Sequence, residues 1–430
     1  MKRLLLTTAL AAYGAAFAAP TVSNVHIAAD AAAQAFVVTY DLAGGPAIVT
    51  VDFFANGEPI GPEQRLNLCG DVNRRVESSS GTITWYAGAA APETAFAEVT
   101  AEVTAWDPEE PPDYMAVDLR TGEFSWYAST NALPGGIESD FWRTDMLLMR
   151  NIPVRTAERP DGTVFKMLDR HYVKLTKRFY MAVFECTQRQ WERVMMKGSA
   201  TTYAQRRPAA FKNEDCYAAR ILDYVDYDKI RGTDKGRTWP ASGEVDADSF
   251  MGRLRALTGS DRFDLPTDAQ WEYAYRAGTT TSFFWGSALS GHEKYFRSTA
   301  NGYNMDDGTS PDKETVGLEH GSPRAGSYLP NPWGLYDMPS GTWEYTVDWW
   351  EDASALSANT AETAEADRMG PARSAGQVLH PARGGCSQDA AGNFNSATGR
   401  TAQSSAGSYL GGFHVVYRVD DFDFASSNAQ

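Results

Sequence analysis

The stretch LYDMPSGTWEYTVDWW, residues 335–350, holds three tryptophans, two tyrosines and three carboxylates within sixteen residues. A Pro-Ser-Gly turn at 339–341 interrupts it. This composition is compatible with a packed aromatic core, a metal-binding loop or an active site. Large aromatic side chains dominate burial, so Trp343, Trp349 and Trp350 favour a core. The carboxylates leave all three possibilities open.

The bulk composition limits the class of protein around this stretch. The chain has 430 residues, 43% of them hydrophobic, and this length predicts two domains. The formal net charge is −16. Nucleic acids and anionic membrane surfaces are bound through basic patches, so this acidity argues against both as the main partner.

The N-terminal sequence MKRLLLTTALAAYGAAFAAP is typical of a secretory signal peptide. Lys2 and Arg3 form the positive end, an apolar run follows, and Ala-Phe-Ala at 16–18 fits a cleavage site. We therefore expect a signal peptide over residues 1–18 and a secreted or periplasmic mature protein. No later run is long and apolar enough to predict a membrane span.

Residues 20–106 show apolar and polar side chains that alternate with a period of two. In VTVDFF, Val49, Val51 and Phe53 alternate with polar neighbours, and FAEVTAEVTAW repeats the pattern. Short alternating strands separated by turns such as the Asn-Gly pair at 56–57 predict an immunoglobulin-like β-sandwich. The acidic, proline-rich DPEEPPDY then opens a linker and bridging segment over 107–144.

Two helix starts in the remaining chain share one pattern. TQRQWERVM begins at Thr187 and TDAQWEYAYRAG at Thr267, and each places Gln three residues after Thr, as a capping box does. A third helix is expected in VDADSFMGRLRAL, with Gly259 as its C-terminal cap. The buried face of this third helix is predicted at Phe250, Leu254 and Leu257.

Five segments between residues 179 and 416 resemble, in order, the motifs of one family. FYMAVFECTQRQWERVM resembles FYM-x-x-x-E-V-T-x-x-x-W, and FDLPTDAQWEYAYRAGT resembles R-L-P-T-E-A-E-W-E-Y-A-x-R-x-G. NPWGLYDMPSGTWEYTVDWW resembles N-x-x-G-L-Y-D-M-x-G-N-V-W-E-W-x-x-D-W-Y. PARGGC and GGFHVV resemble the segments R-G-G-S-W and G-F-R-V. These are motifs of the formylglycine-generating enzyme (sulfatase-modifying factor) domain family.

The resemblance implies a fold class and a set of domain boundaries. The family has a loop-rich α+β fold related to C-type lectins, with bound calcium. We therefore expect an α+β protein, in which the N-terminal β-sandwich precedes a domain of this family at 145–420 and a C-terminal tail at 421–430.

The resemblance also assigns calcium ligands in the opening stretch. They are Asp337, the carbonyl groups of Ser340 and Thr342, and Glu344. Calcium prefers about six to eight oxygen ligands in flexible geometry, which two carboxylates around a tight turn can begin to supply. Asp stands at 337 where the family usually has Asn, and the added charge favours the cation. Alternatively, Asp337 and Glu344 only cap turns or pair with arginines.

A second calcium site is expected in ANGYNMDDGTSPDKE. It would use Asn301, the carbonyl of Gly302 and one of three aspartates, Asp306, Asp307 or Asp312. The same density of Asp, Asn and Gly also describes an ordinary loop.

The enzymes of this family bind copper(I) through two cysteines a few residues after R-G-G. Here RGGCSQDAAGNFNSATGR contains one cysteine, Cys386, at the position of the family's serine. Copper(I) selects soft thiolates, and a lone thiol cannot form the two-sulfur site. The sequence therefore predicts no copper and no formylglycine generation, with Cys386 the only catalytic candidate. Arg383, Cys386 and Arg400 are expected to frame the remnant of the substrate groove.

These observations favour an exported, calcium-stabilised module that binds an unknown protein, peptide or glycan. The alternative is an active oxidase of the same family that acts on sulfatase-like cysteine substrates. Binding is a reasonable role for the retained scaffold because function depends on the site and not on the fold.

Overall fold

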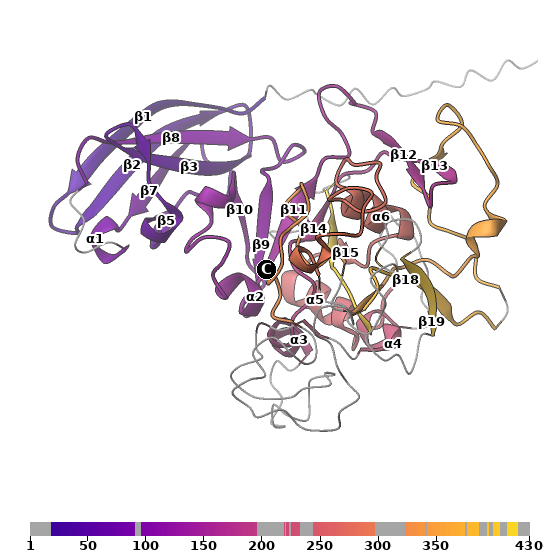
Figure 1. Ribbon diagram of the computed structural model, residues 1–430. Coiled ribbons are helices and arrows are strands. Elements are labelled where there is room, and N and C mark those ends of the chain that lie inside the picture. The colour runs from indigo at the N-terminus through magenta and orange to yellow at the C-terminus, as the bar shows by residue number, and fades with distance from the viewer. Residues whose placement is uncertain are drawn as a thin grey trace, which may run out of the picture. The chain divides into compact units, whose positions relative to one another are not determined.

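A computed structural model of the protein describes residues 19–90, 96–195, 219, 221–222, 225–232, 244–296, 323–339, 342–374, 376–386, 394, 399–404 and 411–419. The predicted signal peptide and the C-terminal tail lie outside the described residues. The chain forms two compact units, Met1–Pro111 and Pro112–Gln430. Figure 1 shows the strands of the first unit and the mixed strands and helices of the second.

The first unit consists of two antiparallel sheets. One has the strand order β1-β2-β7-β5, and in the other β3 pairs with β4, β6 and β8. The strands are β1 (Thr21–Asp30), β2 (Ala35–Ala43), β3 (Ala47–Ala55), β4 (Glu58–Pro59), β5 (Leu68–Gly70), β6 (Arg74–Val76), β7 (Ser80–Trp85) and β8 (Val99–Trp106). A turn η1 (Pro62–Gln64) and a short helix α1 (Ala87–Ala90) connect them.

Alternating side chains of both sheets form one core in this unit. The core includes Val38 and Tyr40 from β2, Val49 and Val51 from β3, and Ile83 and Trp85 from β7. Asn56 and Gly57 have positive φ angles of 52° and 81° in the turn between β3 and β4, as the Asn-Gly pair predicts. The predicted β-rich N-terminal region is present, and its immunoglobulin-like topology stays a prediction.

A six-stranded sheet organises the second unit. Its strand order is β10-β9-β11-β14-β21-β15. The strands are β9 (Tyr114–Asp118), β10 (Phe124–Tyr127), β11 (Met146–Ile152), β14 (Phe179–Ala182), β15 (Phe263–Asp264) and β21 (Val416–Arg418). The segment 107–144, expected as a linker, therefore contributes β9, β10, the turn η2 (Thr130–Ala132) and the helix α2 (Phe141–Thr144) to this unit.

Two smaller sheets complete the second unit. One has the order β12-β13-β17, and the other has the order β19-β18-β16-β20. Their strands are β12 (Thr163–Met167), β13 (His171–Leu175), β17 (Glu365–Ala366), β16 (Trp343–Tyr345), β18 (Leu379–Arg383), β19 (Arg400–Ser404) and β20 (Gly411–Gly412). The turns η4 (His292–Lys294) and η5 (Ala353–Ala355) lie in the loops.

Three helices of the second unit lie where the sequence predicts them, α3 (Gln188–Met195), α5 (Phe250–Thr258) and α6 (Asp268–Arg276). The short helices α2 and α4 (Tyr227–Ile230) were not predicted. Thr267 and Gln270 form the expected capping box, Thr187 and Gln190 exchange the same two hydrogen bonds, and Gly259 caps α5 with a φ of 66°. In α5, Phe250 and Leu254 are buried, whereas Leu257 is only partly buried.

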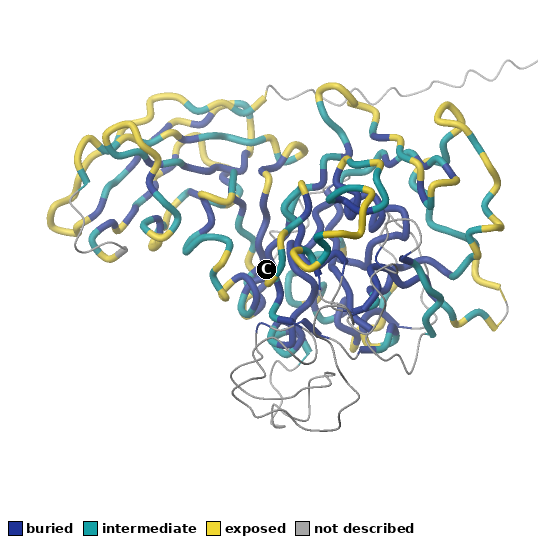
Figure 2. Tube along the Cα trace, viewed as in Figure 1, coloured by how far each residue is buried: buried dark blue, intermediate teal, exposed yellow. Residues whose placement is uncertain are grey.

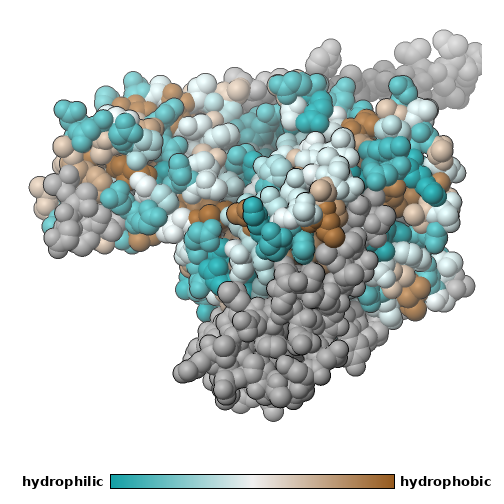
Figure 3. All heavy atoms as spheres, in the orientation of Figure 1, coloured by the Kyte–Doolittle hydropathy of each residue, from teal (hydrophilic) through white to brown (hydrophobic). Residues whose placement is uncertain are grey.

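Helix α6 is the most enclosed of these elements, because every residue from Asp268 to Arg276 is buried. Figure 2 shows this burial as a dark-blue region in the second unit. On the face shown in Figure 3, hydrophilic and hydrophobic residues are interspersed wherever spheres are coloured. Among the described residues, no helix has the length and apolar character needed to cross a membrane.

Candidate functional site

Three sequence motifs meet at the short strand β16. Glu344 of β16 lies opposite Arg383 of β18 on one side and opposite Gly412 of β20 on the other. The opening acidic stretch, the R-G-G segment and the C-terminal GGFHVV segment are therefore neighbours in one sheet. Each contributes a side chain or a close backbone approach around Glu344.

Glu344 is a buried carboxylate with two unequal oxygens. The side chain is 1% exposed. Its Oε2 accepts a hydrogen bond from Nε1 of Trp271 (3.0 Å) and lies 2.6 Å from Nδ1 of His414. Its Oε1 is buried and has no hydrogen-bond partner within the part of the chain that the structure describes. A buried carboxylate oxygen without a partner is unfavourable unless a cation or another donor reaches it.

Asp337 begins the turn that leads to Glu344, and its φ of 62° is left-handed. Both carboxylate oxygens accept from the backbone N–H of Gly326, at 3.1 and 2.8 Å. Burial raises the pKa of Asp337 to about 6. The Gly326 N–H, His414 and Arg143 oppose this rise, and the negative charge of Glu344 adds to it. Asp337 is thus a carboxylate whose charge the surrounding protein only partly compensates.

A third buried carboxylate lies beside the turn. Glu185 is fully buried, and its Oε1 accepts a hydrogen bond from the hydroxyl of Thr342. Any Cβ at Gly412 would lie 2.0 Å from both of these oxygen atoms, so β20 can approach only because the residue is glycine. We call Glu185, Asp337, Thr342 and Glu344 the acidic loop site.

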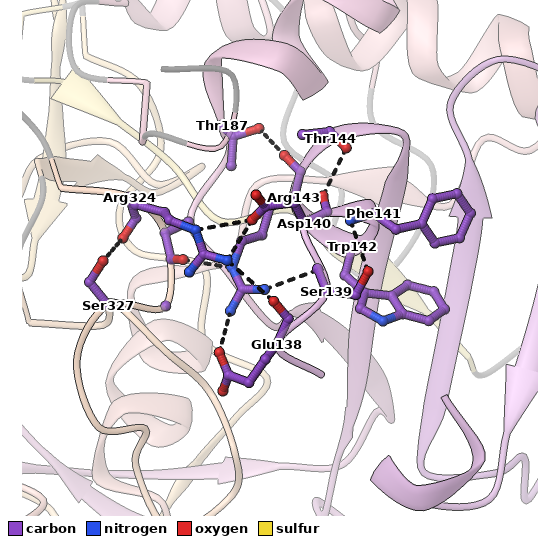
Figure 4. A network of polar contacts seen from close by, with 12 residues as sticks. Glu138, Ser139, Asp140, Phe141, Trp142, Arg143, Thr144, Thr187, Arg324 and Ser327 are labelled. Carbon is purple, nitrogen blue, oxygen red and sulfur yellow. Dashed lines mark hydrogen bonds and ion pairs between the residues drawn. The ribbon is translucent and has the colours of Figure 1, made fainter. Parts of the chain in front are cut away.

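Arg143 of α2, whose polar contacts Figure 4 shows, holds the backbone next to Gly326, which donates to Asp337. The guanidinium of this fully buried side chain donates to the carbonyls of Ala325 (2.6 Å), Ile137 (3.0 Å) and Ser139 (3.1 Å). A Cβ at Gly326, whose φ is 73°, would lie 2.6 Å from the Arg143 guanidinium. Arg143 and Gly326 therefore fix the N–H that binds Asp337.

Arg383 and Arg400, predicted to frame a groove, form buried ion pairs with α6. Arg383 contacts Asp268 and lies 2.7 Å from Glu272, and Arg400 lies 2.8 Å from Asp268. Arg276 lies 2.8 Å from Glu272. These five residues are named the α6 ion-pair cluster. Burial opposes ionisation of Asp268, but Arg383 and Arg400 outweigh it and lower its pKa.

Cys386 follows the R-G-G segment as predicted, and it is buried with 4% exposure. At Gly384, whose φ is 90°, a Cβ would lie 2.7 Å from the Met338 carbonyl oxygen, so the R-G-G turn packs directly on the acidic loop. The sequence places no second cysteine between 387 and 399. The segment after R-G-G therefore supplies one thiol, fewer than the two that a two-thiolate copper(I) site needs.

Several predicted ligands lie outside the described residues. They are Ser340 of the first calcium site and all candidates of the second, Asn301, Gly302, Asp306, Asp307 and Asp312. Glu185 of the acidic loop site and His414, which contacts Glu344, were not predicted, although both belong to the segments that carry the family motifs. They could have been found only by knowing that these segments meet in space.

The described side chains fit a hard cation in part. Among them, no group of three or more His, Cys, Asp or Glu is arranged to hold a metal ion. The predicted calcium site needs only two carboxylates, with carbonyl oxygens for the rest. The Oε1 atom of Glu344 has no partner among the described residues and the pKa of Asp337 is raised. Calcium at this site stays a prediction.

This geometry belongs to a loop-rich α+β domain in which an acidic turn packs against an R-G-G segment. Residues 151–419 match the family model of the sulfatase-modifying factor enzyme 1-like domain. The chain belongs to this family.

The relatives are similar over part of their length. The chain is 33% identical over 87 residues to the formylglycine-generating enzyme of Mus musculus. This match covers 20% of the chain and 22% of that enzyme. It is 30% identical over 172 residues to the formylglycine-generating enzyme of Streptomyces coelicolor. This match covers 38% of the chain and 49% of that enzyme. The matches thus span between about a fifth and a half of these enzymes.

Solved structures show similarity at lower identity. Treponema denticola variable protein 1 aligns with a TM-score of 0.43 and 16% identity, over 64% of this chain and 95% of that one. PvdO from Pseudomonas aeruginosa aligns with a TM-score of 0.40 and 18% identity, over 63% and 94% of the two chains.

Proposed function

We propose that this protein is an exported, calcium-stabilised binding module of the family that does not generate formylglycine. The observation that carries the proposal is the single cysteine, Cys386, in the segment where the family's copper pair is expected. One thiolate cannot supply the linear two-sulfur coordination that copper(I) prefers. Export rests on the predicted signal peptide, and N-terminal sequencing of the secreted protein should begin at Ala19.

The calcium role is supported by the charge of the acidic loop site. Asp337, Glu344 and the carbonyl groups of Ser340 and Thr342 would hold the ion, which supplies positive charge to a buried acidic turn. A hard cation would neutralise the carboxylate whose pKa is raised and would satisfy the Oε1 atom of Glu344.

An oxidation assay tests the absence of formylglycine generation. Purified protein is incubated with copper(I), oxygen and a Cys-x-Pro-x-Arg peptide, and aldehyde is measured by hydrazide labelling and mass spectrometry. We expect the cysteine of the peptide to remain unchanged. Aldehyde that forms in wild type and disappears in Cys386→Ala would contradict the proposal.

The same assay examines the second candidate function, an active oxidase with altered chemistry. It is favoured by the relatives, several of which are formylglycine-generating enzymes. Under this alternative, Cys386 and a second group would act on sulfatase-like cysteine substrates. Cys216 lies outside the described residues, and Cys216→Ala in the same assay tests it as that second group.

Calcium binding is tested by elemental analysis and thermal melting. A ligand that binds only the folded state stabilises it by about 2.7 kcal/mol at a concentration of one hundred times Kd. Chelation with EGTA should therefore lower the melting temperature of wild type, and added calcium should restore it. The calcium site is refuted if wild type does not respond, or if Asp337→Ala/Glu344→Ala responds as strongly as wild type.

A further inference from the structure

A separate groove of about 530 Å³ lies between strand β12 and the C-terminal end of α6. Its size is within the range of pockets that bind small molecules or short peptide segments, about 300 to 1,000 Å³. Its walls include residues 163–166 of β12, Tyr273 and Arg276 of α6, residues 278–280 and Trp333. Figure 1 shows the β12–β13 hairpin near α6, and β12 and α6 are in contact.

The groove follows the edge of β12. Side chains of a strand alternate between its two faces, so a cavity on one face is lined by every second residue. Here four consecutive residues, 163–166, line the cavity. The strand order β12-β13-β17 leaves β12 at the outer position of its sheet. The backbone N–H and C=O groups of an edge strand are a template for another strand.

The groove is basic, although the protein is acidic. Three cationic side chains line it, Arg159, Lys166 and Arg276, with one carboxylate, Asp169. The whole chain has 39 Lys and Arg against 55 Asp and Glu. Arg276 is paired with Glu272 and Asp169, at 2.8 and 3.0 Å. Within the described residues, Lys166 and Arg159 form no ion pair and stay exposed to an incoming anion.

Aromatic rings form the apolar part of the groove. Tyr273 is buried, and its ring lies 5.0 Å from Trp333 and 5.3 Å from Phe165. Trp333, Phe165 and Tyr172 are only half-buried, so part of each ring remains accessible. Lys166 lies 5.8 Å from the ring of Tyr172. Val164, on the same strand face as Lys166, is 38% exposed.

We propose that this groove binds an extended peptide segment with alternating acidic and apolar side chains, which adds as a strand to the edge of β12. The inference names a site and a ligand class for the binding role proposed above, and it rests on that role. Backbone hydrogen bonds to β12 hold the peptide. Its acidic side chains lie beside Lys166 and its apolar side chains beside Phe165, because cross-strand neighbours share a face.

The probe for this site is a fluorescein-labelled Asp-Phe-Asp-Leu-Asp-Val peptide, measured by fluorescence anisotropy at low ionic strength. We expect binding that weakens as salt is added, because the charges are exposed and screened. Lys166→Glu should weaken binding at least about tenfold, since it places like charges opposite each other. The matched control is Lys229→Glu, an exposed lysine of α4 outside the groove, which should bind as wild type does.

Two further measurements address strand addition. Hydrogen exchange of the β12 amides should slow when the peptide binds. A peptide N-methylated at every second residue should lose binding in one of its two registers, because only alternate amides of a strand face its neighbour. Unchanged binding in both registers overturns strand addition.

Failure of this inference and failure of the proposed function give different results. Equal affinity of wild type and Lys166→Glu, or equal binding of a Lys-Phe-Lys-Leu-Lys-Val peptide, overturns the groove assignment. A heparin-derived tetrasaccharide that binds where the acidic peptide does not overturns the ligand class. Lys166→Glu should keep the wild-type melting curve and calcium response. Aldehyde formation in the oxidation assay overturns the proposed function whatever the peptide does.

Discussion

The α6 ion-pair cluster and the acidic loop site are both buried and charged, but their charges are compensated differently. In the cluster, Arg383 and Arg400 lower the pKa of Asp268. In the acidic loop site, burial raises the pKa of Asp337 to about 6, although Arg143 and His414 are near. The same residue type is thus stabilised as an anion in one place and destabilised in the other. The difference indicates that the charges of the cluster compensate one another, whereas the charge of Asp337 is less well compensated by the described residues.

The largest loss of stability is expected when an arginine is removed from the α6 ion-pair cluster. Arg383→Ala removes the arginine that the buried Asp268 and Glu272 share, and leaves them only Arg400 and Arg276. Removing one member of a buried ion pair typically costs about 3 to 5 kcal/mol. Guanidinium chloride unfolding, followed by tryptophan fluorescence, should show a loss of this size for the second unit.

The control for this experiment is Lys229→Ala, which removes an exposed cation and should change the unfolding free energy by less than about 0.5 kcal/mol. If Arg383→Ala loses less than about 1 kcal/mol, the α6 ion-pair cluster does not hold this domain together in the way its geometry suggests.

At the acidic loop site, we expect removal of a charge to raise the unfolding free energy and not to lower it. The pKa of Asp337 rises from 3.8 to about 6 on folding, so ionising this side chain destabilises the folded state at pH values above about 6. The penalty disappears as pH falls below about 4. A difference of two pKa units corresponds to about 3 kcal/mol. In EGTA at pH 7.5, Asp337→Asn should therefore be more stable than wild type by up to about this amount.

Calcium and pH provide the controls for that experiment. At pH 4, the two proteins should differ little, because Asp337 is then protonated in wild type. In saturating calcium, wild type should gain stability and Asp337→Asn should gain less, since the ion has lost a charged ligand. Equal stability of the two proteins in EGTA at both pH values would show that Asp337 is compensated by the protein itself.

Local structure was predictable from the sequence because local patterns determine it. The Thr-Gln pairs at 187 and 267 gave the starts of α3 and α6, and Gly259 gave the end of α5. In the N-terminal unit, the alternation of VTVDFF was enough to indicate β3. The family and its α+β domain followed from five segments whose order could be read directly along the chain.

Contacts between distant segments were not predictable in this way. The Thr342–Glu185 hydrogen bond joins residues 157 positions apart, and that between Trp271 and Glu344 joins residues 73 positions apart. No local pattern encodes such a pairing. The strand at 114–118 was missed for another reason, because the prolines that precede it suggested a connector, whereas its short apolar run pairs with β10 and β11.

The smallest predicted effect is a loss of α6 stability that leaves calcium binding at the acidic loop site unchanged. Thr267→Ala removes the side chain that caps α6 through the Gln270 N–H, at 3.1 Å, and the loss of such a cap typically costs about 1 kcal/mol. Because the hydrogen bonds of the cap involve none of the calcium ligands that the structure describes, the melting shift between EGTA and calcium should match that of wild type. Thr267→Ser, which keeps the hydroxyl, is the matched control. If the calcium shift shrinks in Thr267→Ala and recovers in Thr267→Ser, the position of α6 controls the acidic loop site, and the two regions act as one.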